Sequence, residues 1–169
     1  MRSYSVPTLA EFNAAEQPAA VALVRPCLDV DRWIDAVVDG RPYGDVAALV
    51  DVAQTAADPF TDAELDSALR HHPRIGERAG GASAEANHSR SEQSGVSADD
   101  DVQRRLAEGN RAYEERFGHV FLIRAAGRSG EEILDALEQR LANDAETEKS
   151  IMAEQLRQIA ALRLEGIFG

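Results

Sequence analysis

Helix-capping signals and helical spacing recur along this chain, whereas the alternation of polar and apolar residues that marks a β-strand is nowhere sustained. Thr8 and Glu11 form one predicted capping box, and Thr61 and Glu64 form a second. Glycine and proline residues punctuate the helical stretches. We therefore predict an all-α fold, a single-domain helical bundle of about eight to nine helices that spans residues 1–169.

The expected helices differ in length, with the longest in the second half of the chain. Each carries apolar residues every three or four positions. After a capped turn at residues 8–11, they cover roughly residues 18–25, 31–38, 45–57, 61–71, 84–93, 97–117, 131–141 and 144–164. The apolar run at residues 119–123 fits either an extended chain or a buried helical turn.

The charge balance restricts the partners of this chain. Thirty acidic and eighteen basic residues give a net charge of -12. Such a chain repels phosphate backbones and anionic lipid, so we expect neither nucleic-acid nor membrane binding. An anionic substrate would have to be met by positive charge gathered locally at the site.

Cys27 is the only cysteine, which excludes an intrachain disulfide and a thiolate metal site built from one chain. It follows Pro26 in an apolar stretch, so we expect a buried structural thiol. The N-terminal sequence has no apolar run typical of a signal peptide or a membrane span. These features favour a cytoplasmic protein.

The pair His72-Pro73 is the first candidate for chemistry. Proline disfavours helical geometry at the residue before it, so the preceding helix should end near His71 and leave His72 at the end of that helix. An imidazole titrates near neutral pH and can donate or accept a proton. An isolated histidine at a helix end is more often a surface residue. The Pro-Arg-Ile-Gly sequence that follows and a polar cluster downstream favour a catalytic role here.

That polar cluster occupies residues 89–93, inside a Gly-, Ala- and Ser-rich stretch that would otherwise suggest a flexible linker. On a helix, Ser89, Glu92 and Gln93 share one face because residues three and four apart are neighbours. Their hydroxyl, carboxylate and amide suit a planar heterocycle or a urea-like group that both donates and accepts hydrogen bonds. An N-terminal capping box from Ser89 to Glu92 is an equally good interpretation of the spacing.

Other constellations are weaker. The four histidines, at positions 71, 72, 88 and 119, form no recognisable metal-ligand set, and no nucleophile elbow, P-loop or dinucleotide fingerprint is present. Arg163 on the last helix is a candidate anion clamp, because a guanidinium can hold a carboxylate in bidentate fashion. Taken alone, it would be interpreted as a solvated helix arginine.

Several stretches together resemble the family of 2-oxo-4-hydroxy-4-carboxy-5-ureidoimidazoline (OHCU) decarboxylases. The resemblance runs from about Thr8 to Leu164, and its order and spacing are more specific than any one piece. The similar stretches are His-Pro-Arg-Ile-Gly at 72–76, Ser-x-x-Glu-Gln-x-Gly at 89–95, Asn-x-x-Tyr-x-x-x-Phe-Gly-x-x-Phe-x-Ile at 110–123, Arg-Leu-x-Asn at 140–143, Glu148, and Ile-x-x-x-Arg-Leu at 159–164.

This resemblance implies an all-helical enzyme, commonly a homodimer, that catalyses the last step of urate conversion to allantoin. Such enzymes decarboxylate OHCU stereoselectively to (S)-allantoin and carbon dioxide without a metal or an organic cofactor. It also implies a site with His72, Glu92 and Arg163 as catalytic residues. The implied substrate-binding residues are Pro73, Ser89, Arg90, Ser91, Glu92, Gln93, Phe121, Leu122, Ile123, Arg124 and Ala125.

Within this implied site, backbone groups matter in the stretch from Phe121 to Ala125, where we expect a smaller side chain than that of Arg124. We hypothesise that His72 carries the proton, Glu92 holds ureido N–H groups, and Arg163 holds an anionic oxygen.

Two alternatives from other classes remain open. A noncatalytic helical interaction module would reduce the same motifs to helix caps and core residues, with no clustered polar pocket. A metal-dependent ureide hydrolase that uses His and Glu ligands would carry bound Zn or Mn when purified.

Overall fold

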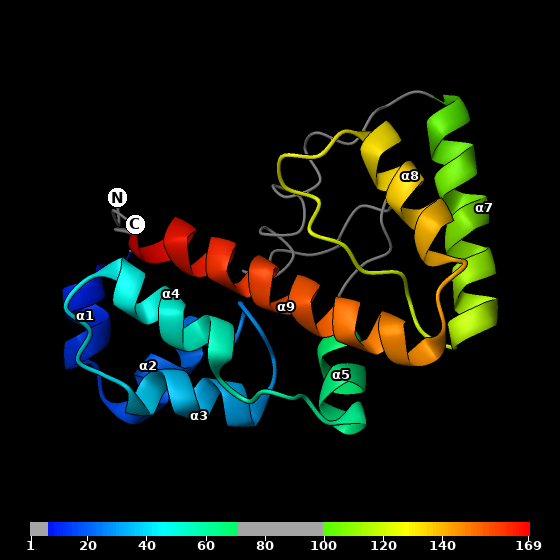
Figure 1. The fold of residues 1–169 in the computed structure, drawn as a ribbon. Coiled ribbons are helices and arrows are strands. Elements are labelled where there is room, and N and C mark those ends of the chain that lie inside the picture. Colours follow the sequence, from blue (N-terminus) through cyan, green and yellow to red (C-terminus); the bar gives the residue numbers. More distant parts are fainter. Residues whose placement is uncertain (1–6, 71–99) are drawn as a thin grey trace. The chain divides into compact units, whose positions relative to one another are not determined.

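The computed structural model describes residues 7–70 and 100–169, and in these two ranges the chain forms eight helices and no strand (Figure 1). This confirms the predicted all-α class. The helices are α1 (Leu9–Ala14), α2 (Gln17–Val24), α3 (Asp31–Asp39), α4 (Val46–Thr55), α5 (Asp62–Leu69), α7 (Asp100–Phe117), α8 (Gly130–Arg140) and α9 (Ala145–Phe168).

The described residues divide into two compact units. The first contains the residues up to Phe60 together with Arg157–Gly169, and the second contains Thr61–Leu156. Helix α9 therefore contributes its first half to the second unit and its last turns to the first. That residues 1–169 form a single domain remains a prediction from the sequence.

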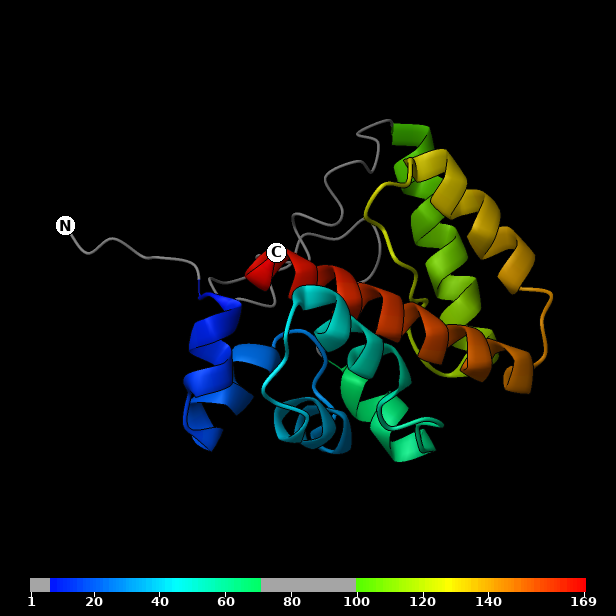
Figure 2. The same ribbon diagram turned by 60° about the vertical axis from the view of Figure 1, so that its left-hand side comes forward.

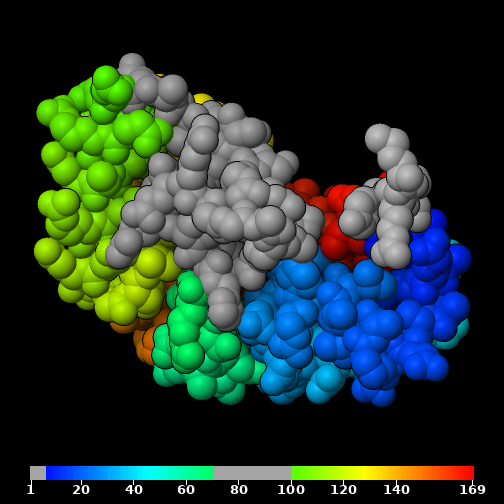
Figure 3. Space-filling view, turned by 180° about the vertical axis from the view of Figure 1, so that it is seen from behind, coloured from blue at the N-terminus to red at the C-terminus, as the bar shows by residue number. Residues whose placement is uncertain are grey.

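The first unit is built on short helices that pack in chain order, α1 on α2, α2 on α3 and α3 on α4 (Figure 2). The space-filling view shows α1, α2 and α3 lying against one another, in blue (Figure 3). Trp33 is fully buried, and its indole N–H donates to the Ala53 carbonyl at 2.9 Å, which ties α3 to α4. Cys27 is buried, as expected.

The second unit contains α5, α7, α8 and the first half of α9. Helices α7 and α8 lie side by side and run in the same direction (Figures 1 and 2). Because the end of α7 is then far from the start of α8, the connection at residues 118–129 has to travel back along the pair. Gly118, with φ 78°, ends α7 in the left-handed conformation that suits glycine.

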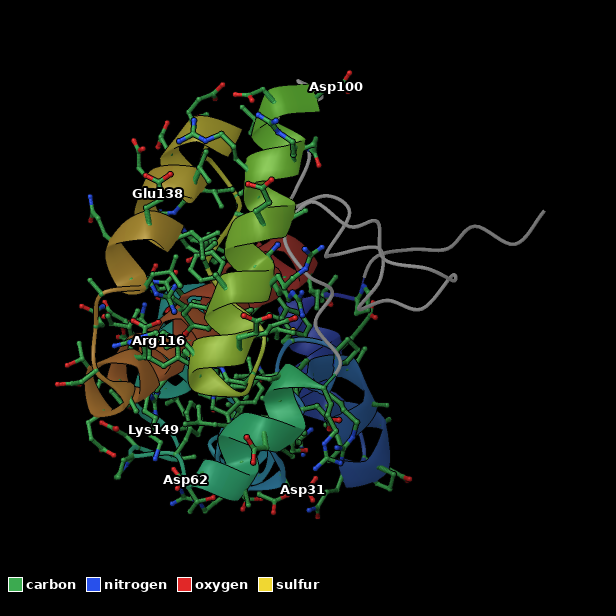
Figure 4. All side chains as sticks on the ribbon, turned by 90° about the vertical axis from the view of Figure 1, so that its right-hand side faces the viewer. Asp31, Asp62, Asp100, Arg116, Glu138 and Lys149 are labelled. Atoms are coloured by element: carbon green, nitrogen blue, oxygen red, sulfur yellow. The ribbon has the colours of Figure 1, made fainter. Side chains whose placement is uncertain are left out.

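Surface ion pairs join neighbouring helices of this second unit. Arg105 on α7 lies 2.9 Å from Glu138 on α8, and Lys149 on α9 lies 3.2 Å from Asp62 on α5 (Figure 4). In both pairs about two fifths or more of each side chain is exposed, so each pair adds little to stability.

Local signals located most helix ends. Thr8 and Asp45 each cap a helix with a side-chain oxygen, and Thr61 with Glu64 forms the complete capping box that was predicted. The predicted helix at 45–57 was too long, because Ala56 is extended and Ala57 has a φ of 57°. Helix α9 was predicted too short, since it continues past Leu164 to Phe168.

Two predicted features, the helix at 84–93 and the cap at Ser97, lie outside the described residues. Among the helices that are described, none is both long enough and apolar enough to cross a membrane.

Candidate active site

The predicted site residues fall into three parts of the chain. His72, Pro73, Ser89, Arg90, Ser91, Glu92 and Gln93 lie outside the described residues. The stretch from Phe121 to Ala125 belongs to the second compact unit, and Arg163 belongs to the first.

The stretch Phe121–Ala125, which we call the binding segment, is neither helix nor strand and forms part of the connection between α7 and α8. Its alternate residues Phe121, Ile123 and Ala125 are buried in one apolar cluster with side chains of α7 and α8. Leu122 between them is buried as well, so the segment is enclosed on more than one side. None of residues 119–123 is helical, which excludes the buried helical turn and leaves the extended alternative for this run.

Polar side chains hold the backbone of the binding segment. Nη1 of Arg140 donates to the Leu122 carbonyl at 2.6 Å, and the Arg124 N–H donates to Oε1 of Gln155 at 2.8 Å. The Arg124 carbonyl accepts a further hydrogen bond, at 2.9 Å, from Nε of Arg128. A buried chain without helix or sheet partners must satisfy its amides and carbonyls in this way.

Behind the segment lies a buried polar network centred on Glu148, which has no exposed surface. One carboxylate oxygen accepts hydrogen bonds from the Tyr113 hydroxyl at 2.5 Å and from Nε of Arg140 at 2.9 Å. The other accepts from the side-chain amide of Asn143 at 2.9 Å. The Arg140 guanidinium also lies 4.5 Å from the ring centre of Phe121, the first residue of the binding segment.

The network fixes the protonation states of its members. Burial opposes ionisation of Glu148, but hydrogen bonds from Arg140, Asn143 and Tyr113 outweigh it and lower the pKa of this carboxyl below its ordinary value. Burial, followed by the hydrogen bond to Glu148, raises the pKa of Tyr113, which keeps its proton. The second unit therefore contains a buried ion pair, and its Arg140 donates a hydrogen bond to the Leu122 carbonyl.

Sequence reasoning gave no role to Arg140, Glu148 and Gln155. The first two belong to the stretches that resemble the family, but they come from two different helices and meet only in the folded chain. Gln155 lies in a predicted amphipathic helix. Its spacing does not distinguish a side chain that hydrogen-bonds to the backbone of another segment from an ordinary polar residue.

Arg124 is the binding-segment residue at which a smaller side chain was expected. Its side chain is partly buried, and its Nε atom is buried with no hydrogen-bond partner among residues 7–70 and 100–169. The side chain thus adds positive charge beside the segment.

Arg163 is buried, with 2 % of its surface exposed, and its Nη1 donates to the Pro26 carbonyl at 2.9 Å. This burial contradicts the solvated-arginine interpretation, because a charged side chain is rarely buried without a specific role. Its contact with substrate stays a prediction.

No group of three or more His, Cys, Asp and Glu side chains that could hold a metal ion occurs in the part of the chain that the structure describes.

Comparison with known proteins identifies the family. A sequence profile of the family described as OHCU decarboxylase matches residues 13–165. The chain belongs to the OHCU decarboxylase family.

Relatives from distant organisms agree with this assignment. An OHCU decarboxylase of Amia calva is 30% identical, over 78% of this chain and 77% of its own length. An OHCU decarboxylase of Haloferax volcanii is 26% identical, over 93% of this chain and 94% of its own. A bifunctional uric acid degradation protein of Bacillus sp. (strain TB-90) is 24% identical over 95% of this chain, which spans 32% of that longer protein.

Solved structures share the fold. A crystal structure of an OHCU decarboxylase in the presence of (S)-allantoin superimposes with a TM-score of 0.70 at 22% identity, covering 91% of this chain and 99% of that one. The crystal structure of an (S)-allantoin synthase also gives a TM-score of 0.70, at 15% identity, over 96% of this chain and 54% of that one.

Proposed function

We propose that this protein is a carboxy-lyase that converts OHCU to (S)-allantoin and carbon dioxide, the last step from urate to allantoin. The observation that carries the proposal is the family match over residues 13–165, which covers nearly the whole chain. Relatives named as OHCU decarboxylases and as a uric acid degradation protein support the same substrate.

The decarboxylation needs no cofactor as an electron sink. Loss of carbon dioxide leaves negative charge on the ring carbon, and the adjoining imidazoline system can delocalise it. The protein has to orient the carboxylate, stabilise the developing charge and deliver a proton to one face of the ring. We therefore propose a reaction without a metal or an organic cofactor.

Each proposed catalytic residue has one task. His72 delivers the proton that replaces the carboxylate, since an imidazole can carry a proton near neutral pH. Glu92 accepts hydrogen bonds from the ureido N–H groups. Arg163 binds an anionic oxygen, and its burial makes a guanidinium a strong partner for an anion.

The remaining proposed contacts orient the substrate. They come from Pro73, from residues 89–93, and from backbone groups of the binding segment. The binding segment suits this task because its apolar side chains are buried and its backbone is held by Arg140 and Gln155.

We further propose that the enzyme acts as a homodimer in the cytoplasm. The resemblance to the family supports the homodimer. The net charge of -12 argues against nucleic acid and anionic membrane surfaces as partners.

Consumption of OHCU tests the proposal and separates it from a metal-dependent hydrolase. The purified protein, added to urate freshly oxidised by uricase and hydroxyisourate hydrolase, should accelerate the loss of OHCU. Exhaustive chelation should leave that rate unchanged, with no stoichiometric transition metal in the protein. Loss of activity on chelation, restored by added Zn or Mn, would favour the hydrolase. No acceleration at all would favour the noncatalytic interaction module.

Glu92→Gln tests whether Glu92 binds substrate or caps a helix. The substitution keeps the shape of the side chain and removes its charge. We expect kcat/KM to fall while thermal unfolding stays nearly unchanged. If Glu92 only caps a helix, the variant should instead lose about 0.5–2 kcal/mol of stability and turn over normally.

A further inference from the structure

The polar groups of the binding segment that are bound by side chains lie on one side of its backbone. In an extended chain, the N–H and C=O groups of alternate residues point to the same side, and those of the residues between point to the other. The Leu122 carbonyl and the Arg124 N–H are two such same-side groups. Arg140 binds the first and Gln155 binds the second.

These two anchors differ in what supports them. Arg140 is fixed by its buried ion pair with Glu148, so the Leu122 anchor belongs to the core of the second unit. Gln155 is only partly buried and reaches the Arg124 N–H from α9 through a single 2.8 Å hydrogen bond. Its loss should therefore loosen one end of the binding segment without opening the core.

We propose that Gln155 is a positioning residue for the substrate. By holding the Arg124 N–H, it fixes the backbone so that the opposite-facing groups of Phe121 and Ile123 are presented in a constant direction. The inference rests on the proposed function, in which those backbone groups contact OHCU. Gln155 itself touches the segment and acts through it.

Three variants separate positioning from folding. Gln155→Met has a similar length but no oxygen to accept the Arg124 N–H, whereas Gln155→Glu keeps that oxygen. Gln139→Met makes the same change at an exposed glutamine on α8 of the same unit. Each variant is compared with the unchanged protein in OHCU turnover, thermal unfolding and amide hydrogen exchange.

We expect Gln155→Met to raise KM about tenfold, on the scale by which misplaced binding groups weaken catalysis, with kcat within about twofold. The Arg124 amide should exchange about tenfold faster, the loss expected for one hydrogen bond. Gln155→Glu should restore both values, and Gln139→Met should change neither. A merely structural role would lower the folded fraction, and therefore the apparent kcat, at an unchanged KM.

The outcomes distinguish this inference from the proposed function. A wild-type KM in Gln155→Met, with the unchanged protein active, overturns the positioning role, and so does an Arg124 amide that stays protected. If the unchanged protein fails to consume OHCU, the proposed function fails instead. The exchange measurement then still decides whether Gln155 holds the segment.

Discussion

His72→Asn should fold normally and lose OHCU decarboxylation by roughly two orders of magnitude or more, the usual scale for a positioned acid or base. Asparagine is similar in size to histidine and still forms hydrogen bonds, but it cannot shuttle a proton near neutral pH. The residue precedes Pro73, where the sequence predicts the end of a helix, and from that position a side chain can reach a pocket without disturbing a core. Steady-state turnover and thermal unfolding of the variant measure the two halves of this expectation.

The adjacent histidine provides the matched control. His71→Asn makes the same chemical change one position earlier, at the residue expected to end the helix. We expect its turnover to stay close to that of the unchanged protein. Near-normal decarboxylation by His72→Asn, with an inactive His71→Asn, would show that the proton carrier is the other histidine.

Glu148→Gln should cost about 3–5 kcal/mol of unfolding free energy, because it leaves Arg140 as a buried cation without its carboxylate. Glu148 has no exposed surface and its partner Arg140 has 7 %. The amide of the variant cannot accept from Tyr113, Arg140 and Asn143 in the way that the carboxylate does. Urea-induced unfolding of the variant and the unchanged protein gives the difference.

A second Arg–Glu pair in the same unit is the control for this loss. Glu138 lies 2.9 Å from Arg105, but about half of each side chain is exposed. Glu138→Gln should therefore change the unfolding free energy by less than about 1 kcal/mol. Equal losses from Glu138→Gln and Glu148→Gln would contradict the importance that we give to the buried network.

The same network predicts the direction of an acid effect. The folded-state pKa of Glu148 lies below the ordinary value of 4.5, so folding favours its ionised form. Its stabilising contribution is therefore complete above that value and is lost as the pH falls through the lower folded-state pKa. The stability gap between the unchanged protein and Glu148→Gln should shrink accordingly when urea-induced unfolding is repeated in increasingly acidic buffer.

Local chemistry explains why most of the fold could be predicted from the sequence. A capping oxygen binds a backbone N–H within three residues. The starts of the helices after Thr8, Asp45 and Thr61 could therefore be identified from the amino-acid sequence. The end of α4 was harder to place, because the left-handed residue there is Ala57 and not a glycine.

Only part of the candidate site could be predicted from the sequence, because several of its contacts join residues far apart in the chain. The order of its motifs indicated the family, which the comparisons confirm. The contacts that Arg140 and Gln155 make with the binding segment join residues 18 and 31 positions apart, so no local pattern could indicate them. Arg163 shows the same limit, since the carbonyl to which it donates lies 137 residues away in the sequence.

The handedness of the product tests the central claim most directly. Circular dichroism of allantoin, followed after this protein is added to freshly generated OHCU, measures both rate and stereochemistry. A proton delivered to one face by His72 should give accelerated formation of (S)-allantoin alone. Racemic allantoin that accumulates no faster than in the absence of protein would contradict the assignment of this chain as an OHCU decarboxylase.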